Sequence, residues 1–499
     1  MTGAPLQLHN SLSRATEPFR PLDPANVRVY SCGPTVYNYA HLGNLRAYVF
    51  TDTLARALRW KGYPLTHVLN ITDVGHLQSD ADAGEDKMEA RARETGQDIW
   101  AVARHYTDAF RSNLADLNIA EPTRMPLATD HVAEMIAFAK VIEANGFTYR
   151  LSREDTPEAP GLYFDVRKLG NNYGKLARSE TEAARHWITE GRIELVEQKE
   201  RVADFALWRT TPAGENRQME WDSPWGRGAP GWHLECSVMS RMYLGDRFDI
   251  HTGGIDHREI HHPNEIAQNQ AHRGCPEDPD YTGATFWMHN NFLVDRTGKM
   301  SKSSGEFLTL QAVIDRGFHP LAYRLMCLQT HYRSEMEFGW EGLAAAATRL
   351  KRLVQSVEAL RARAGQAIED DASDPLGPEL DQFDRSVSDD LATPRALVAL
   401  DQALDRKKVP PAAKLRAVAR MDEVLGLNLT ALTRADLRVR AVGATINGSE
   451  VEARLAERQE ARAARDFARS DAIRDELAAQ GVEVMDGDPL GWDWKVQTR

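Results

Sequence analysis

The stretch VRVYSCGPTVYNYAHLGNLR, residues 27–46, carries the pattern that decides the fold. Residues 27–32 are rich in β-branched and aromatic side chains, which is typical of a short buried strand. A Gly-Pro pair ends this strand, and an amphipathic helical pattern follows over residues 43–62. Residues 66–72 predict a second strand. Strand, helix and strand within about 45 residues indicate a parallel βαβ unit.

The whole chain has 499 residues, of which 42% are hydrophobic and 27% charged, as in globular proteins. This length predicts roughly two to four domains. The net charge of −12 argues against a broadly cationic nucleic-acid coat but leaves local basic patches possible. We expect no membrane span, since no apolar run approaches ~18 residues. The widely spaced cysteines and the lack of a signal-peptide pattern favour a reducing cytoplasm.

A second α/β half is predicted to begin near RFDIHTGG, residues 247–254. The segment before it has helical patterns at 96–118 and 130–145 and a tryptophan-rich region, 208–232, that we expect to be loop. We find no internal repeat.

The last third of the chain is predicted to be mainly helical. Residues 341–365 form a long helical pattern with one apolar stripe. An acidic, proline-containing break follows at 369–381. Near the end, residues 465–481 predict a helix, and 481–486 with 493–496 predict a small hairpin.

One group of residues could ligate a metal. His261 and Glu265 are four residues apart, a spacing that puts both on one face of a helix. Pro263 between them fits only the first turn of that helix. Together with Cys32 and Cys236 they offer two thiolates, an imidazole and a carboxylate, all of which Zn²⁺ accepts. Spacing alone leaves simpler interpretations open: a buried cysteine usually acts as a small hydrophobe, and the carboxylate could cap the helix.

Two short motifs could bind a nucleotide. AHLGN, residues 40–44, lies between the first strand and its helix, where His41 could donate to a phosphate at the helix N-terminus. KMSKS, residues 299–303, places Lys299 and Lys302 in a Gly/Ser-rich loop that could surround a triphosphate. Each motif alone is also consistent with an ordinary loop, and the P-loop and dinucleotide fingerprints are absent.

In this order, HLGN and KMSKS resemble the two signatures of class I aminoacyl-tRNA synthetases. Further stretches narrow the resemblance to the cysteinyl-tRNA synthetase family: LNITDVGH, ADFALW, PGWHLECS, FDIHTGGID, HHPNEIAQ, HYRSEMEF and DDLATPRAL. The resemblance spans nearly the whole chain, from LQLHNSLSR to DFARSDAIRDEL. It departs from the family pattern at Leu42 and Asn44, within the HIGH signature, and at Pro263, where the family often has Glu.

The resemblance implies an α/β protein: a Rossmann-like parallel-sheet catalytic domain with an insertion, then a helical anticodon-binding region and a small C-terminal α+β tail. The expected segments are 1–120 and 231–290 for the two catalytic halves, 121–230 for the connective insertion, 291–342 for the KMSKS loop and stem contact, 343–430 for the helical bundle, and 431–499 for the tail.

The implied activity is cysteine–tRNA ligation: L-cysteine and ATP form an adenylate, and the cysteinyl group passes to tRNA-Cys. The resemblance implies one Zn²⁺ per chain, with Mg²⁺ accompanying ATP, and we expect a monomer. It implies four zinc ligands: Cys32, Cys236, His261 and Glu265. His41, Lys299 and Lys302 are the implied catalytic groups, and they also bind ATP together with Gly43, Asn44, Gly253, Gly254 and Asp256. The implied cysteine-binding residues are Gly33, Thr72 and Trp232.

We hypothesise that the substrate thiolate binds the zinc ion directly. Zinc favours thiolate over hydroxyl, so serine would be rejected without an editing site. Size discrimination alone in an apolar pocket gives only ~10–200-fold.

Two groups of basic residues predict tRNA contact in the last third of the chain, although such runs are commonly just solvated helix faces. They are Arg349, Lys351, Arg352, Arg361 and Arg363 on one helix, and Arg406, Lys407, Lys408, Lys414 and Arg416 further on. Cys275 and Cys327 match no motif, and we interpret them as structural.

Two other functions share these motifs. A ligase of the same fold that joins activated cysteine to an amino-sugar would need no anticodon-binding part, so the 150-odd residues after HYRSEMEF argue against it. An inactive RNA-binding paralogue would not need an intact KMSKS sequence or an intact ligand set.

Overall fold

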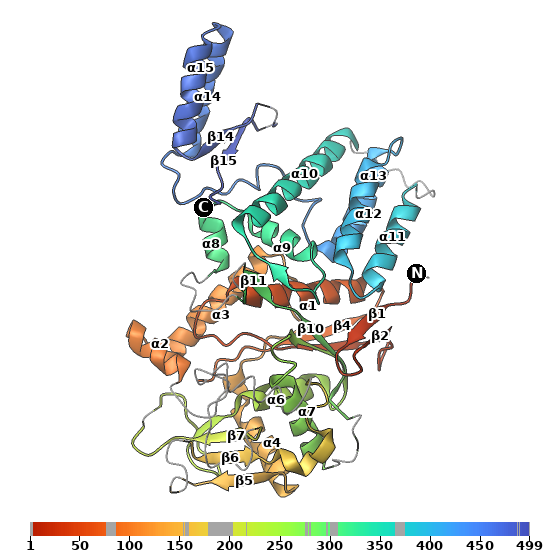
Figure 1. Cartoon of the computed structure of the whole chain (residues 1–499), viewed down its shortest axis with the longest axis vertical. Helices are drawn as coiled ribbons and strands as arrows, with labels where there is room; N and C mark the ends of the chain where they lie inside the picture. The colour runs from red at the N-terminus through yellow and green to blue at the C-terminus, as the bar shows by residue number, and fades with distance from the viewer. Residues whose placement is uncertain are drawn as a thin grey trace.

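The fold is built around a small parallel sheet whose two faces are covered by helices (Figure 1). The computed structural model describes residues 3–75, 86–152, 154, 159–177, 203–215, 217–274, 278, 281–295, 298–299, 308–364, 375–486, 488 and 490–498. None of the helices within these ranges is long and apolar enough to cross a membrane.

The central sheet has the strand order β10-β9-β3-β4, and all its strands are parallel. Helix α1 (Leu42–Trp60) connects β3 (Val27–Ser31) to β4 (Leu65–Leu69), which confirms the predicted βαβ unit. Helix α7 (His261–Arg273) connects β9 (Phe248–Gly254) to β10 (Ala284–Asn290). The predicted second α/β half therefore joins the same sheet, beside β3.

The sheet lies between two helical layers in Figure 1, with α1 on one side and α6 (Trp232–Leu244) and α7 on the other. The strands of this sheet are buried along most of their length, and β9 buries polar residues such as Asp249 and His251 together with its apolar ones. The N-terminal hairpin of β1 (Gln7–Asn10) and β2 (Ala15–Pro18) runs along β10, where the backbone N–H of Ser11 donates to the carbonyl of Trp287 at 2.8 Å.

The insertion between β4 and β9 contains an antiparallel sheet of order β5-β6-β7-β8. The prediction of loop over 208–232 is wrong at both ends, because β7 (Phe205–Thr210) and β8 (Gly228–Pro230) lie there. All six residues of β7 are buried, so the strand lacks the alternation of a half-exposed strand. The other elements here are α2 (Lys87–Thr95), α3 (Ile99–Asp116), α4 (Val132–Ala144), β5 (Thr148–Leu151) and β6 (Gly161–Phe164).

Two helix boundaries differ from those predicted. Gly96 caps the end of α2 in a left-handed conformation, with φ of 64°, so the helix predicted from residue 96 begins only at Ile99. The predicted break at 369–381 is helical from Gly377, because a proline is tolerated in a first helical turn.

Beyond the sheet, a helical bundle packs on the outer face of α1 (Figure 1). The buried residues of the predicted stripe, including Leu343, Leu350 and Val357, join one core with α1. The elements of this region are β11 (Leu293–Asp295), β12 (Gly298–Lys299), α8 (Leu310–Asp315), α9 (Pro320–Leu328), β13 (Met336–Glu337), α10 (Trp340–Ala364), α11 (Gly377–Ser388), α12 (Thr393–Asp405) and α13 (Pro411–Leu425).

A buried guanidinium joins this bundle to the sheet. Arg324 on α9 is 0% exposed, and its Nη2 lies 2.5 Å from the Asp52 carboxylate on α1. Its Nε donates to the carbonyl of Leu425 at the end of α13, and its Nη1 donates to the carbonyls of Leu117 and Asn118 after α3. One side chain thus connects four elements.

The tail has a core of its own, formed by residues such as Val451, Ile473 and Trp492. Helices α14 (Gly448–Ala463) and α15 (Phe467–Ala479) pack together beside a hairpin of β14 (Val482–Val484) and β15 (Trp492–Trp494), as predicted. Figure 1 shows these helices standing away from the rest of the molecule.

Candidate active site

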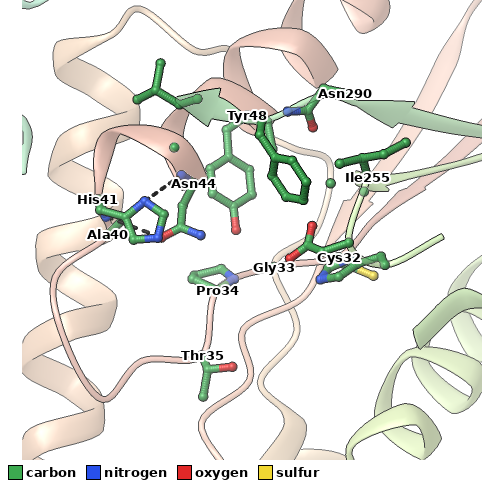
Figure 2. A pocket seen from close by; sticks show the side chains of 18 of the residues that line it. Cys32, Gly33, Pro34, Thr35, Ala40, His41, Asn44, Tyr48, Ile255 and Asn290 are labelled. Carbon is green, nitrogen blue, oxygen red and sulfur yellow. Dashed lines mark hydrogen bonds between the residues drawn. The ribbon is translucent and has the colours of Figure 1, made fainter. Parts of the chain in front are cut away.

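A cavity of about 390 Å³ opens at the carboxyl ends of β3 and β9. β3 and β9 are neighbours, but the chain continues from β3 to β4 at one edge of the sheet and from β9 to β10 at the other edge. Their ends therefore form a topological switch point, where open α/β sheets bind ligands. Figure 2 shows Cys32 and Gly33 on one side of this cavity and His41 and Asn44 on the other.

Most of the residues predicted to bind ATP or cysteine line this cavity, together with the predicted metal ligand Cys32. They are Gly33, His41, Gly43, Asn44, Trp232, Gly253, Gly254 and Asp256.

The remaining predicted residues are placed differently. Thr72 is 2% exposed and is not among the residues that line the cavity, and its hydroxyl donates to the buried Glu235 at 2.9 Å. Lys299 is described only by its backbone, which pairs with Val294 in β12 and β11. Lys302 lies outside the described residues.

The four predicted metal ligands converge at the metal cluster, which we define as Cys32, Cys236, His261 and Glu265. One ligand atom from each lies within 4.8 Å of those of the others, and all four residues are buried. The two Sγ atoms are 3.8 Å apart, and His261 Nε2 lies 3.2 Å from Glu265 Oε1. A tetrahedral ion with Zn–S of ≈ 2.3 Å and Zn–N of ≈ 2.0 Å needs edges of about 3.8 Å and 3.3 Å, so the donor set fits such an ion.

A second, overlapping set of four residues meets the same distance criterion: Cys32, Glu265, His251 and His262. In this set His251 Nε2 is already occupied, because it lies 2.9 Å from Glu265 Oε2 and donates to it. His261 Nε2, by contrast, is buried without a hydrogen-bond partner and lies 3.2 Å from Glu265 Oε1 within the cluster. The set with two cysteines is therefore the better ligand set.

Neighbouring histidines orient these ligands. His233 Nδ1 lies 3.0 Å from His261 Nδ1, which holds the ring so that its Nε2 faces the cysteines. Burial opposes charge on His261, but the Cys236 thiolate and the Glu265 carboxylate raise its pKa to about 10. Burial also opposes charge on Glu265, yet His251 and His261 lower its pKa to about 2. The cluster thus concentrates anionic ligand atoms where a cation would neutralise them.

The HLGN motif forms the opposite wall as the start of α1. His41 is the N-cap residue: its Nδ1 accepts from the backbone N–H of Asn44 at 3.1 Å, and Asn44 Oδ1 accepts from the backbone N–H of His41 at 3.3 Å. This capping box commits Nδ1 as an acceptor, so the neutral ring carries its proton on Nε2. His41 can therefore donate to an anion at the helix N-terminus.

Glycines let the backbone come close to a ligand on this side. A Cβ on Gly43 would lie 3.0 Å from the His41 ring, and a Cβ on Gly254 would lie 2.4 Å from Asp256 Oδ1. A Cβ on Gly253 would meet His262 at 2.7 Å. These positions accept no larger side chain without displacing a residue of the site.

The structure adds residues that the sequence analysis missed. His251, His257, His262 and His289 surround the cluster, and Tyr48 and Asn290 line the cavity. The unusual density of histidine between residues 231 and 290 was the available signal.

The predicted basic groups are partly engaged within the molecule. Arg349 pairs with Asp401 at 2.7 Å, and Lys351 pairs with Asp493 at 2.5 Å. Arg361 donates to backbone carbonyls, Arg406 pairs with Glu379, and Lys414 donates to the carbonyl of Leu404. The exposed members are Arg352, Arg363, Arg406, Lys407 and Lys408. Cys327 is a buried free thiol, as expected of a structural residue, and Cys275 lies outside the described residues.

Comparison with known proteins identifies the class of protein that has this fold. The family model for the catalytic domain of class I (C) tRNA synthetases matches residues 18–348. Two solved structures share the fold: methionyl-tRNA synthetase of Mycobacterium tuberculosis bound by methionyl-adenylate (TM-score 0.52, 17% identity, 81% of this chain and 90% of that one) and a LeuRS–tRNA–LeuAMS complex of Agrobacterium radiobacter (TM-score 0.56, 12% identity, 85% and 88%). The chain is a class I aminoacyl-tRNA synthetase.

Relatives specify the family within this class. The chain is 59% identical to the cysteine–tRNA ligase of Novosphingobium aromaticivorans, over 99% of this chain and 97% of the relative. It is 54% identical to that of Zymomonas mobilis (99% and 98%) and 39% identical to that of Thermus thermophilus (96% and 97%). A model for the cysteinyl-tRNA ligase anticodon-binding domain matches residues 448–489. The chain belongs to the cysteine–tRNA ligase family.

Proposed function

We propose that this chain activates L-cysteine with ATP and transfers the cysteinyl group to the 3′ end of tRNA-Cys, releasing AMP and pyrophosphate. One observation carries the proposal. Cys32 belongs to the metal cluster and also lines the cavity whose opposite wall is the N-terminus of α1. A cluster that we propose to select thiols therefore lies beside a helix N-terminus that we propose to bind phosphate.

The metal we propose is zinc, held by Cys32, Cys236, His261 and Glu265, since two thiolates and an imidazole suit it better than Mg²⁺ or Ca²⁺. When bound, zinc supplies a centre that prefers the thiolate of cysteine to the hydroxyl of serine. Gly33 and Trp232 line the same side of the cavity and would enclose the small amino acid. The position of Thr72 suggests an indirect role, through Glu235.

Activation needs no protein nucleophile, because the cysteine carboxylate attacks the α-phosphate itself. The protein positions the reactants and stabilises charge on the leaving pyrophosphate. His41 would donate from Nε2 to a phosphate oxygen, and Lys299 and Lys302 would add positive charge, with Mg²⁺ on the phosphates. Asp256 would accept from a ribose hydroxyl, beside the backbone at Gly253 and Gly254.

We propose that tRNA binds along the last third of the chain. The segment that matches the anticodon-binding model, 448–489, lies in what we expected to be the tail, 431–499, rather than in the bundle, 343–430. We therefore assign the anticodon contact to the tail as well as to the bundle, and the exposed Lys407 and Lys408 would face the tRNA backbone. A monomer acting in the cytoplasm is consistent with this arrangement.

The test is cysteine-dependent exchange of pyrophosphate into ATP, with serine as control and with zinc removed by a chelator. We expect exchange with cysteine alone, lost on chelation and restored by zinc. Transfer is then assayed with tRNA-Cys and with an amino-sugar acceptor. Transfer to the sugar but not to tRNA would assign the chain to the rival ligase, and no exchange from zinc-loaded protein would refute the proposal.

A further inference from the structure

A chain of buried polar side chains leads from the N-terminal segment to the metal cluster. Ser11 Oγ lies 2.8 Å from His289 Nδ1, and His289 Nε2 lies 2.8 Å from His262 Nδ1. His262 Nε2 lies 3.4 Å from Cys32 Sγ. All four residues are at most 8% exposed, and they come from three separate parts of the sequence.

The Cys32 end of this series of side chains determines which atom donates in each hydrogen bond. Both rings are buried, His262 being 0% and His289 3% exposed, and a neutral imidazole offers one hydrogen-bond donor and one acceptor. A cysteine that ligates a metal is a thiolate and can only accept. His262 must then donate from Nε2 and accept at Nδ1, so His289 donates from Nε2 and accepts the Ser11 hydroxyl proton at Nδ1.

We propose that His262 is a positioning residue for Cys32, donating to its thiolate in a tautomer that His289 and Ser11 fix. The inference rests on the proposed metal-binding role of Cys32. It gives the cluster a neutral donor that offsets part of the charge on one thiolate. A site with two thiolates and a carboxylate, which must still accept a substrate thiolate, benefits from such a donor.

The alternative is that His262 is itself a ligand. Its Nε2 is 3.9 Å from Glu265 Oε1, so distance alone permits this. The alternative set also needs His251, whose Nε2 proton is committed to Glu265, and it leaves the buried Nε2 of His261 without a partner. In the outer position, His262 is hydrogen-bonded at both ring nitrogens, and His261 Nε2 is left for the metal.

Cobalt(II) substitution tests the proposal without relying on activity, because thiolate-to-cobalt charge transfer reports on the sulfur atoms directly. The variants are His262→Asn, which removes the donor at Nε2, and His262→Gln, whose amide nitrogen can occupy nearly the same place. His131→Asn is the matched control. His131 is also a buried histidine with two hydrogen bonds, to the carbonyl of Leu127 at 2.7 Å and to Tyr243 at 2.8 Å, but it lies outside the cluster.

In His262→Asn we expect the charge-transfer band to move to longer wavelength, since a thiolate that loses a hydrogen bond gives up its electron more easily. Metal affinity should fall about 10–100-fold, as for other outer partners of metal ligands. His262→Gln should restore both properties, and Ser11→Ala should shift the band in the same direction by less. The His131→Asn control should match the wild type.

Two results overturn the proposal. Equal effects of the Asn and Gln variants, or no effect of either, would leave His262 a packing residue only. Loss of one nitrogen ligand from the cobalt spectrum in both His262 variants, with none lost in His261→Asn, would make His262 the ligand. If wild-type protein bound no cobalt, the proposed metal site itself would be refuted. That outcome differs from both results above, in which wild-type protein binds cobalt.

Discussion

The two sides of the cavity are built in different ways. The metal cluster consists of buried side chains from the end of β3, from α6 and from α7, each held by further buried side chains. The nucleotide side consists mainly of backbone: a half-buried His41 in a capping box, an exposed Asn44 and three glycines. Chemical selection between a thiol and a hydroxyl needs fixed side chains, whereas recognition of phosphate needs close access to N–H groups. The variants below separate the two sides.

The largest effect is expected from Cys236→Ser, which disrupts the metal side alone. We expect loss of the bound metal and a fall in cysteine activation of about 10⁴-fold, comparable to sites that lose the polar group on which recognition depends. Metal content by atomic absorption and pyrophosphate exchange measure the two effects. ATP binding should persist, because the capping box of α1 is untouched; normal cysteine activation would exclude a role for this thiolate.

The converse variant, His41→Asn, disrupts the nucleotide side. Asn is a favoured N-cap residue, so α1 and the thermal midpoint should be preserved. Loss of the Nε2 donor should lower kcat about 100–1000-fold, as for removal of one donor to a developing charge. Metal content should equal that of the wild type. A large loss of stability instead would show that His41 acts mainly as a cap.

A pH experiment tests the buried His67 on β4, in the central sheet. His67 on β4 is buried against Ser31, with Nε2 2.9 Å from the hydroxyl, and burial lowers its pKa to about 4 from 6.5. The unfolded chain therefore takes up a proton between pH 6.5 and 4 that the folded chain does not. Stability due to neutral His67 is complete above pH 6.5 and is lost as pH falls toward 4, by up to about 3 kcal/mol.

The matched variant is His67→Gln, whose amide can keep the bond to Ser31 but does not titrate. Its unfolding free energy, followed by denaturant titration from pH 7 to 4.5, should fall less steeply than that of the wild type. Parallel curves would mean that His67 is protonated in the folded protein.

The smallest effect is expected from Gly43→Ala on the nucleotide side. Alanine suits a helix better than glycine, so the variant should be as stable as the wild type or up to about 1 kcal/mol more stable. Its Cβ would lie 3.0 Å from the His41 ring and displace it by a few tenths of an ångström. Since small misplacements near the reacting atoms are costly, kcat should fall about tenfold. Unchanged kcat would indicate that the ring has room to adjust.

Local patterns predicted local structure well. The βαβ unit, the helix with His261 and Glu265 on one face, and the C-terminal hairpin all follow from periodicity and from turn residues. The strand β7 was missed because it is buried on both faces, and a strand of that kind has no alternation to detect. The tRNA contact and the roles of Lys299 and Lys302 remain predictions.

Long-range partners could not be found in this way. The sequence suggested that Cys32 and Cys236 might meet, but His262, His289 and Ser11 give no signal beyond the local density of histidine. Their association depends on how the N-terminal segment lies along β10 and how α7 packs on the sheet. Thr72, transferred by motif as a cysteine-binding residue, is 2% exposed, and its role also remains a prediction.

The buried Arg324 has a mechanical consequence. Its guanidinium is bonded at once to α1, to the end of α3 and to the end of α13. Sliding α1 against the bundle would leave a cation without partners in the interior, at a cost of several kcal/mol. The helix that presents His41 and the helices that we propose to contact tRNA should therefore move as one rigid body, and strain from a tRNA bound to the bundle would not be relieved between α1 and the bundle.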